Sequence, residues 1–405
     1  MGDSTDKPAI RPVEAIPTLH EGKRVVVLRD PEGYAEHPVV IGDRGAWILG
    51  LMDGEHSLVD IQAAYTRRYG DILFSTDLEK LIRDLDEACL LEGEGFRKKR
   101  EAAERAYRDA PARPALHLAG YDANEETWGR WLGAFLGEAG DQEPAPPAGV
   151  RALVAPHIDL RLGGPVYGSA WKAALGGEPP ELVVLIGTCH HPLPSLVSVT
   201  AKDFETPLGT VEADGDFLRT LDEKSGGGLF DDEIVHRREH AIEFQALFVR
   251  HLFGDRTRIA PVLCSYSPLH LSDEAPPEFG ERIRSVAGAL GDLVKRRGGR
   301  TLLVASADLS HVGPRYGDEN APDDEELRGL EESDRVYLEA AAAGDPGGLS
   351  RRLLETADST RICGYPPMHL MLSALGGSDG DLLRYDQGVM GEEGSVVSFA
   401  AMAFQ

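Results

Sequence analysis

The sequence has 405 residues, of which 42% are hydrophobic and 27% are charged, and its formal net charge is −26. This composition is typical of a globular protein and excludes wholesale disorder, and the length favours two domains. The negative charge argues against nucleic acid and anionic membranes as partners, because a site for phosphate groups needs clustered Lys and Arg. The first residues lack the basic and apolar regions of a secretory signal, and no apolar run has the length of a membrane span, so we expect a cytoplasmic protein.

The first hundred residues predict a small domain of strands and helices. Two β-branched runs, RVVVL and HPVVI, predict strands, and Ser57 is a plausible helix N-cap before apolar residues at helical spacing. A further helix is expected from about Thr76 to Cys89, so the pattern describes a winged-helix unit. The predicted organisation, in chain order, is a flexible N-terminus (1–20), the small domain (21–97), a linker helix (98–112) and a large domain (113–405).

The segments GAWILGLMDGEHSLVDIQAAYTRRYG and LEKLIRDLDEACLLEG resemble the PqqD-like domains, winged-helix modules that bind leader peptides of ribosomally made natural products. The resemblance implies that a peptide would bind along an exposed strand edge, by β-augmentation. A docking domain for a partner or for the same chain is the alternative. DNA binding is disfavoured, because the last helix of the unit carries five acidic residues against two basic ones.

Beyond Val150, β-branched runs alternate with amphipathic helices, which predicts an α/β sheet covered by helices on both faces. Three runs end alike: RALVAP leads to His157 and Asp159, ELVVLIG leads to His190 and His191, and TLLVASAD leads to Asp308 and His311. In open α/β sheets, functional groups gather beyond the carboxyl ends of the strands. If these strands are neighbours, which is an inference, the histidines form either a metal site or an acid/base site.

A second group of histidines and carboxylates lies downstream. His236 and His240 are four residues apart on an expected helix, but Arg237 occupies the position at which a zincin motif has Glu. Glu239, His240 and Glu243 are expected either to line the crevice or to form a salt-bridge cluster on the helix surface.

The four cysteines have no short paired spacing, so the sequence suggests neither a zinc ribbon nor a disulfide framework. Cys89 and Cys264 lie in apolar segments and are expected in the core. Cys189 adjoins the double histidine and stays undecided. Cys363, beside Gly364, is expected to be a buried small side chain, a thiolate ligand or a nucleophile.

These segments, taken in order, resemble the Memo family, known in prokaryotes as AmmeMemoRadiSam system protein B. The motifs that carry the resemblance are Ala155-Pro156-His157, Gly187-x-x-His190-His191, Glu239-His240-x-x-Glu243, Ser306-x-Asp308-x-x-His311 and Ile362-Cys363-Gly364. The resemblance implies a fold like that of the class III extradiol dioxygenases, which are non-haem iron enzymes. It also implies a radical-SAM enzyme and an AmmeMemoRadiSam system protein A-like protein as partners.

By the same resemblance, His157, His190 and Cys363 match the metal-ligand positions of the family, with iron or copper as the metal. His311 matches the acid/base histidine of the related dioxygenases, with Asp308 and His240 nearby. Residues expected to support this site are Asp159, His191, Glu239 and Glu243. The sequence departs from the family after the first histidine, where Asp159-Leu160-Arg161 replaces a glycine and an aromatic residue, so a relative's substrate preference does not carry over.

Two functional hypotheses follow. The first is a metal-dependent oxidoreductase that reacts a small substrate with dioxygen, acting beside a radical-SAM partner in peptide, protein or small-molecule modification. The second is a non-catalytic metal or peptide adaptor. A zinc hydrolase is a third, weaker hypothesis, because no water-activating Glu accompanies the ligands locally.

Overall fold

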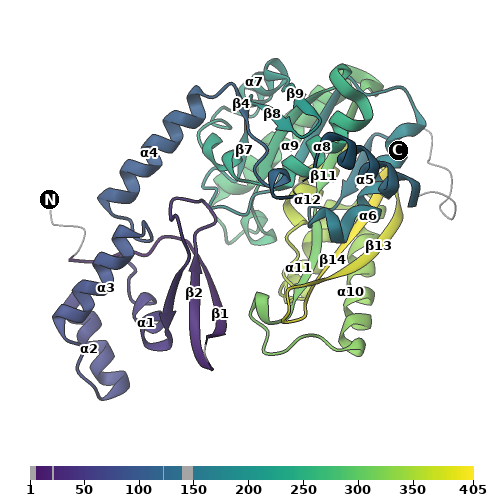
Figure 1. The fold of residues 1–405 in the computed structure, drawn as a ribbon. Helices are drawn as coiled ribbons and strands as arrows, with labels where there is room; N and C mark the ends of the chain where they lie inside the picture. Colours follow the sequence, from purple (N-terminus) through teal and green to yellow (C-terminus); the bar gives the residue numbers. More distant parts are fainter. Residues whose placement is uncertain (1–5, 21, 122, 139–148) are drawn as a thin grey trace. The chain divides into compact units, whose positions relative to one another are not determined.

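The structure is a computed structural model that describes residues 6–20, 22–121, 123–138 and 149–405 (Figure 1). The chain divides into two compact units, Met1–Ala110 and Pro111–Gln405. No helix in the described ranges combines the length and the apolar character that a membrane crossing needs.

The first unit contains a three-stranded antiparallel sheet in the order β1-β2-β3. Its elements are β1 (Glu14–His20), β2 (Lys23–Arg29), β3 (Val39–Gly42), α1 (Asp43–Leu49), α2 (Leu58–Tyr69), α3 (Ser75–Glu87) and α4 (Glu94–Asp109). The predicted N-cap is confirmed: the Ser57 hydroxyl accepts the N–H of Asp60, and the Asp60 carboxylate accepts the N–H of Ser57.

The structure corrects both ends of this unit. Residues 1–20 are not a flexible segment throughout, because β1 pairs with β2 along its whole length. Arg11 is fully buried, forms an ion pair with Asp30 at 3.1 Å and lies over the ring of Phe96. The helix predicted at 98–112 begins at Glu94 and is part of this unit, since Phe96 is buried against Tyr34. Residues 1–5 lie outside the described ranges.

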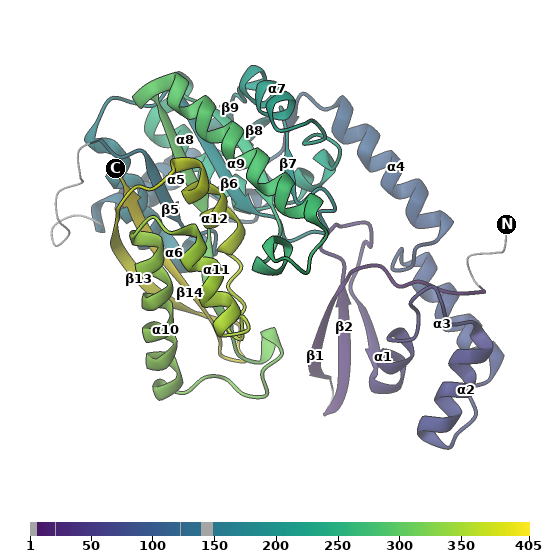
Figure 2. The same ribbon diagram turned by 180° about the vertical axis from the view of Figure 1, so that it is seen from behind.

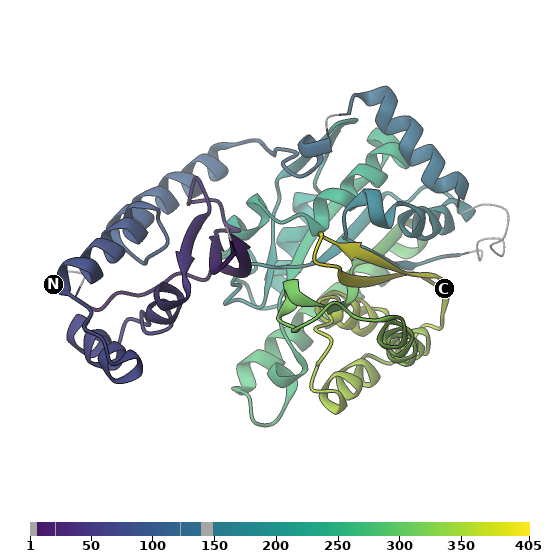
Figure 3. The same cartoon turned by 60° about the horizontal axis from the view of Figure 1, so that its bottom comes forward.

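The second unit is built on an eight-stranded mixed sheet in the order β12-β14-β5-β11-β6-β10-β7, with β13 paired to β14. These strands are β5 (Ala152–Ala155), β6 (Leu182–Thr188), β7 (Val197–Val199), β10 (Arg258–Cys264), β11 (Thr301–Ser306), β12 (Asp308–Val312), β13 (Gly380–Met390) and β14 (Ser395–Phe404). The central strands β5, β11, β6 and β10 are parallel, and the β13–β14 hairpin is yellow in Figure 3. A small sheet joins β4 (Ala112–Arg113), β8 (Asp203–Thr206) and β9 (Gly209–Val211).

Helices cover both faces of the large sheet, as the sequence predicts (Figures 1 and 2). Along β6, Val184 contributes to one core and Leu185 to the other, since successive side chains of a strand point to opposite faces. One core includes α7 (Gly215–Lys224), α9 (Pro277–Arg297), α10 (Asp324–Ala342), α11 (Pro346–Glu355) and α12 (Tyr365–Leu375). The other includes α5 (Glu125–Glu138), α6 (Leu160–Ala173) and α8 (Ala241–Phe253). The buried strands are apolar on both faces for this reason.

Candidate metal centre

The three strand ends that the sequence singles out lie side by side. β11 pairs in parallel with β5 on one side and with β6 on the other. The carboxyl ends of all three strands therefore meet at the same edge of the sheet, where the loops diverge. His157 follows β5, His190 follows β6 and Asp308 follows β11, so the tertiary structure brings these residues to one place.

Three potential ligand atoms converge at this edge. One side-chain atom each of His157, His190 and Cys363 lies within 4.8 Å of the other two. The Cys363 sulfur is 3.3 Å from His157 Nε2, and two donors bound to one tetrahedral metal at ordinary bond lengths are about 3.5 Å apart. The donor set and its spacing therefore fit a single transition-metal ion.

Hydrogen bonds behind the imidazole rings fix which nitrogen faces the centre. His157 Nδ1 lies 3.0 Å from the carbonyl oxygen of Ser306, and His190 Nδ1 lies 3.1 Å from the Glu239 carboxylate. A carbonyl and a carboxylate only accept, so each Nδ1 donates, and Nε2 is the atom that a metal can bind in place of a proton. This tautomer is the one that metal-binding histidines require.

Asp308 holds the first histidine in place. Its Oδ1 accepts the N–H groups of His157 at 2.8 Å and of Ile158 at 3.3 Å, and its Oδ2 is 3.6 Å from His157 Nε2. Burial raises the pKa of Asp308, and the neighbouring imidazole only partly offsets this effect. Burial disfavours protonation of His157, but Asp308 and Cys363 outweigh it and raise the pKa of the imidazole to about 9.

Cys363 reaches the centre from the loop before α12. Thr188 Oγ1 donates to the Cys363 carbonyl at 2.9 Å, and a side chain at Gly364 would collide with the carbonyl oxygen of Asp308. Burial favours the neutral thiol, but the imidazoles of His157 and His311 hold the pKa of Cys363 well below its usual range. The lowered pKa favours the thiolate, the form that binds metals.

The loop that carries Cys363 has a strained backbone. Ala357, Asp358 and Arg361 adopt positive φ values of 51°, 45° and 57°. Arg361 holds this conformation by donating to the carbonyl oxygen of His311 at 2.8 Å and by pairing with Asp318. Such conformations persist only where surrounding contacts enforce them, so the position of Cys363 is set by the fold.

His311 lies within a strand rather than directly after β11. Asp308–Val312 forms β12, which pairs antiparallel with β14. His311 Nδ1 is 2.9 Å from the carbonyl oxygen of Leu309, so this nitrogen donates and Nε2 is the basic atom. Burial lowers the pKa of His311, and the Cys363 thiolate more than compensates, so that the net shift is upward.

Comparisons with known proteins identify the family of this chain. The model of the Memo-like protein family matches residues 113–403, a stretch that contains every residue described at the centre. The chain belongs to the Memo-like family. A MEMO1 family protein of Aquifex aeolicus is 28% identical over 382 residues, covering 93% of this chain and 95% of the relative. A MEMO1 family protein of Thermus thermophilus is 31% identical over 342 residues, covering 82% and 94%.

Both alignments cover more of this chain than the second unit contains, so each includes part of the first unit. A MEMO1 family protein of Methanopyrus kandleri, by contrast, covers 64% of this chain at 30% identity. A crystal structure of an uncharacterized protein from Escherichia coli K12 matches 63% of this chain and all of that chain, with 16% sequence identity and a TM-score of 0.38.

A second cluster of ionisable side chains adjoins the first in this Memo-like domain. His190, Glu239 and His240 also have potential ligand atoms within 4.8 Å of one another. The rings of His190 and His240 stack with centroids 4.8 Å apart, and both Nδ1 atoms face the buried Glu239 carboxylate. Burial opposes ionisation of Glu239, but the two imidazoles hold its pKa well below the usual range. Glu239 is thus the residue that orients both rings.

The predicted helix through His236 and His240 is wrong. His236 lies in a 3-10 helix, Glu233–Arg237, and α8 begins only after His240. The carboxylate of Glu239 accepts the N–H groups of His240 at 2.8 Å and of Ala241 at 3.2 Å. These are among the amides that the start of a helix leaves without a partner inside the helix, so Glu239 favours a new helix at this point.

The other residues that were predicted to support the metal site make different contacts. Glu243 forms a buried ion pair with Arg113 at 2.7 Å and accepts the N–H of His117, which ties the start of the domain to α8. Asp159 caps α6 by accepting the N–H of Arg161 at 2.8 Å. His191 is buried beside the first cluster and belongs to neither ligand group among the described residues.

Three contributors were not anticipated: the Ser306 carbonyl, the Thr188 hydroxyl and Arg361. A carbonyl, a hydroxyl and a single Arg in a loop carry no distinctive pattern in one sequence, so only the fold identifies them.

Proposed function

We propose that this domain binds one redox-active metal ion, iron or copper, through His157, His190 and Cys363 and acts as a metal-dependent oxidoreductase on a small substrate. The observation that carries the proposal is the convergence of the side-chain ligand atoms of His157, His190 and Cys363, with both histidine Nδ1 atoms held by acceptors behind the rings. Two histidines and one anionic ligand, with the other positions open, resemble the ligand set of non-haem iron oxygenases, with a thiolate in place of the carboxylate. The likeness to the extradiol dioxygenases is part of this proposal.

A nucleophilic cysteine is a weaker explanation of the same residues. Such a cysteine needs one neighbouring base, whereas three imidazoles, those of His157, His190 and His311, interact with the Cys363 sulfur. Two of these rings already donate their Nδ1 hydrogens to fixed acceptors behind them. Two imidazole Nε2 atoms beside one cysteine sulfur, each ring held from behind by an acceptor, are an arrangement that a metal ion stabilises.

The side chains around the ligands supply the proton transfers. When bound, the metal would supply a Lewis-acidic and redox-active centre next to the substrate. His311 Nε2, free for a proton because Nδ1 donates to the chain, accepts the proton of a substrate hydroxyl and later returns it. Asp308 fixes His157, and His240 lies against His190 as a neutral imidazole, because burial lowers its pKa.

The test is the metal content of protein purified without oxygen. Elemental analysis of the wild type is expected to give near-stoichiometric iron or copper, and His190→Ala and Cys363→Ala are each expected to lose it. His251→Ala, a histidine of α8 outside both ligand groups, is the matched control and is expected to keep the metal. Metal-dependent oxygen consumption then separates an enzyme from a metal carrier. Absent metal, or metal retained in both ligand variants, would refute the proposal.

The first unit supports a second proposal, that the protein recruits a peptide or a radical-SAM partner. β1 and β3 are the outer strands of its sheet, and an outer strand can accept an added strand by β-augmentation. This proposal includes a PqqD-like winged-helix fold for the first unit, a leader peptide as its ligand and the AmmeMemoRadiSam proteins as partners. It also includes a cytoplasmic location, which is consistent with four cysteines that form no disulfide. Binding of a candidate leader peptide without any turnover would favour the adaptor function.

A further inference from the structure

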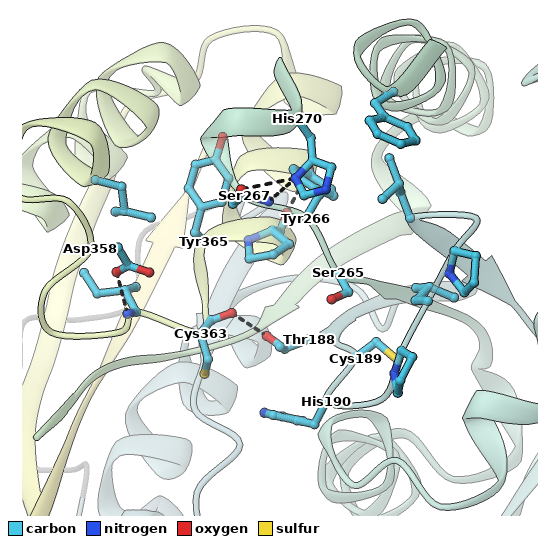
Figure 4. A pocket seen from close by; sticks show the side chains of 18 residues that line it. Thr188, Cys189, His190, Ser265, Tyr266, Ser267, His270, Asp358, Cys363 and Tyr365 are labelled. Carbon is cyan, nitrogen blue, oxygen red and sulfur yellow. Dashed lines mark hydrogen bonds between the residues drawn. The ribbon is translucent and has the colours of Figure 1, made fainter. Parts of the chain in front are cut away.

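A cavity of about 730 Å³ opens beside the candidate metal centre (Figure 4). It lies beyond the carboxyl ends of β6 and β10, which are parallel neighbours in the sheet. Its volume is within the range of roughly 300 to 1,000 Å³ that is usual for small-molecule sites. The cavity is therefore large enough for a ligand that extends well past the metal ligands.

The two ends of the cavity have different chemistry. His190 and Cys363 lie at one end, and Ser267 and His270 lie at the other (Figure 4). His270 belongs to the 3-10 helix Pro268–Leu271, which follows β10. A ligand that fills the cavity would thus contact a second polar site, formed by Ser267 and His270, away from the metal ligands.

His270 provides a hydrogen-bond donor at this second polar site. Its Nδ1 lies 3.1 Å from the backbone nitrogen of Ser267 and 3.1 Å from the Ser267 hydroxyl. An amide nitrogen only donates, so Nδ1 accepts and the ring hydrogen is on Nε2. Within the described part of the chain, this Nε2–H has no hydrogen-bond partner. The hydroxyl of Ser265 also lines the cavity.

Part of the cavity lining is apolar and has a restricted conformation. Pro192 and Pro194 lie on one wall, and Leu196 next to them has a positive φ of 63°, which is rare for a residue with a side chain. Phe279 of α9 packs against the His270 ring with centroids 5.4 Å apart. Because these lining residues have little conformational freedom, few of their conformations are lost when a ligand binds, which lowers the entropic cost of binding.

The charge around the cavity selects against anions. Neither Lys nor Arg is among the described residues that line it, and Asp358 is the one carboxylate there. Asp358 Oδ1 already accepts the N–H of Ile362 at 2.9 Å.

We propose that the cavity binds an uncharged small molecule with an apolar body and a carbonyl or amide oxygen at one end. His270 Nε2–H donates to that oxygen, and the other end of the molecule lies at His190 and Cys363. The assignment of the reacting end rests on the proposed function. Recognition at His270 does not require the metal.

The experiment compares three probes that share one apolar body: 3-phenylpropanamide, 3-phenylpropanoate and 3-phenylpropylamine. Dissociation constants are measured by ligand-observed NMR with the full chain freed of metal by a chelator, so that failure of the metal proposal does not affect the outcome. The amide is expected to bind best. One lost hydrogen bond in His270→Phe is expected to weaken amide binding by about fivefold. His270→Gln, whose amide nitrogen can replace Nε2, is expected to restore binding.

His37→Ala, an exposed histidine of the first unit, is the control and is expected to bind like the wild type. Stronger binding of the carboxylate or the amine than of the amide would overturn the proposal, and so would equal binding by wild type and His270→Phe. If the amide binds through His270 while elemental analysis finds no metal, the ligand inference survives and the proposed oxidoreductase function fails.

Discussion

Replacing Glu239 by Gln tests whether the orientation of the imidazoles controls metal affinity. The carboxylate is buried, and its Oε2 accepts the N–H of His190 at 2.7 Å while its Oε1 accepts the N–H of His240 at 2.8 Å. In either orientation, the amide of Gln places its NH₂ group against a backbone N–H. One buried donor then lacks a partner, at a cost of about 1–3 kcal/mol in the free energy of unfolding.

The effect on the metal follows from the same contacts. Glu239 also accepts from His190 Nδ1, at 3.1 Å, and so fixes the ring that offers Nε2 to the metal. Loss of a carboxylate that orients a ligating histidine typically weakens metal binding by about 10- to 100-fold, which corresponds to about 1.4–2.8 kcal/mol. We therefore expect Glu239→Gln to raise the dissociation constant for iron(II) or copper(I) within this range, measured by anaerobic competition with a chromophoric chelator.

Glu243→Gln is the matched control. Glu243 is equally buried, but its carboxylate contacts Arg113 and His117 rather than a proposed ligand. This variant removes the partner of a buried Arg and should cost about 3–5 kcal/mol in stability, yet it should leave metal affinity unchanged in the folded protein. Unchanged affinity in folded Glu239→Gln, or an equal loss in Glu243→Gln, would refute the assigned role of Glu239.

Three further outcomes are expected. Cys363→Ser should remove any sulfur-to-metal charge-transfer absorption and lower the metal content, and a spectrum identical to that of the wild type would contradict thiolate ligation. His311→Gln should keep the metal while lowering metal-dependent turnover by roughly 10²- to 10⁴-fold; an equal loss of metal would assign His311 to binding instead. Burial raises the pKa of Asp30, but Arg11 and the surrounding N–H groups outweigh this effect, so the net shift is downward. The carboxylate therefore stabilises the fold at pH values above its unfolded pKa of about 3.9. This stabilisation is lost as the pH falls through the folded pKa. Asp30→Asn should therefore destabilise the first unit by about 3 kcal/mol at pH 7 and by much less at a pH below the folded pKa of Asp30. Urea unfolding with hydrogen exchange at β2 measures this, and a difference that does not depend on pH would contradict the assignment.

The sequence by itself determined the family and those elements that depend on local patterns. The β-branched runs before His157 and His190 are strands, because residues buried on both faces of a parallel sheet are apolar throughout. The ordered motifs predicted the Memo family, and the family match over residues 113–403 confirms it. The side chain of Ser57 was sufficient to predict the start of α2, since an N-cap depends on atoms only a few residues away.

Only the tertiary structure decided how these elements meet. Strand order is a long-range property, so nothing in the sequence near His157 or His190 shows that β11 lies between β5 and β6. The sequence also missed β1 and misplaced the helix through His236, because pairing with β2 and the carboxylate of Glu239 decide those boundaries. Local patterns specify strands, caps and residue types, whereas a site assembled from several loops depends on the packing of the whole sheet.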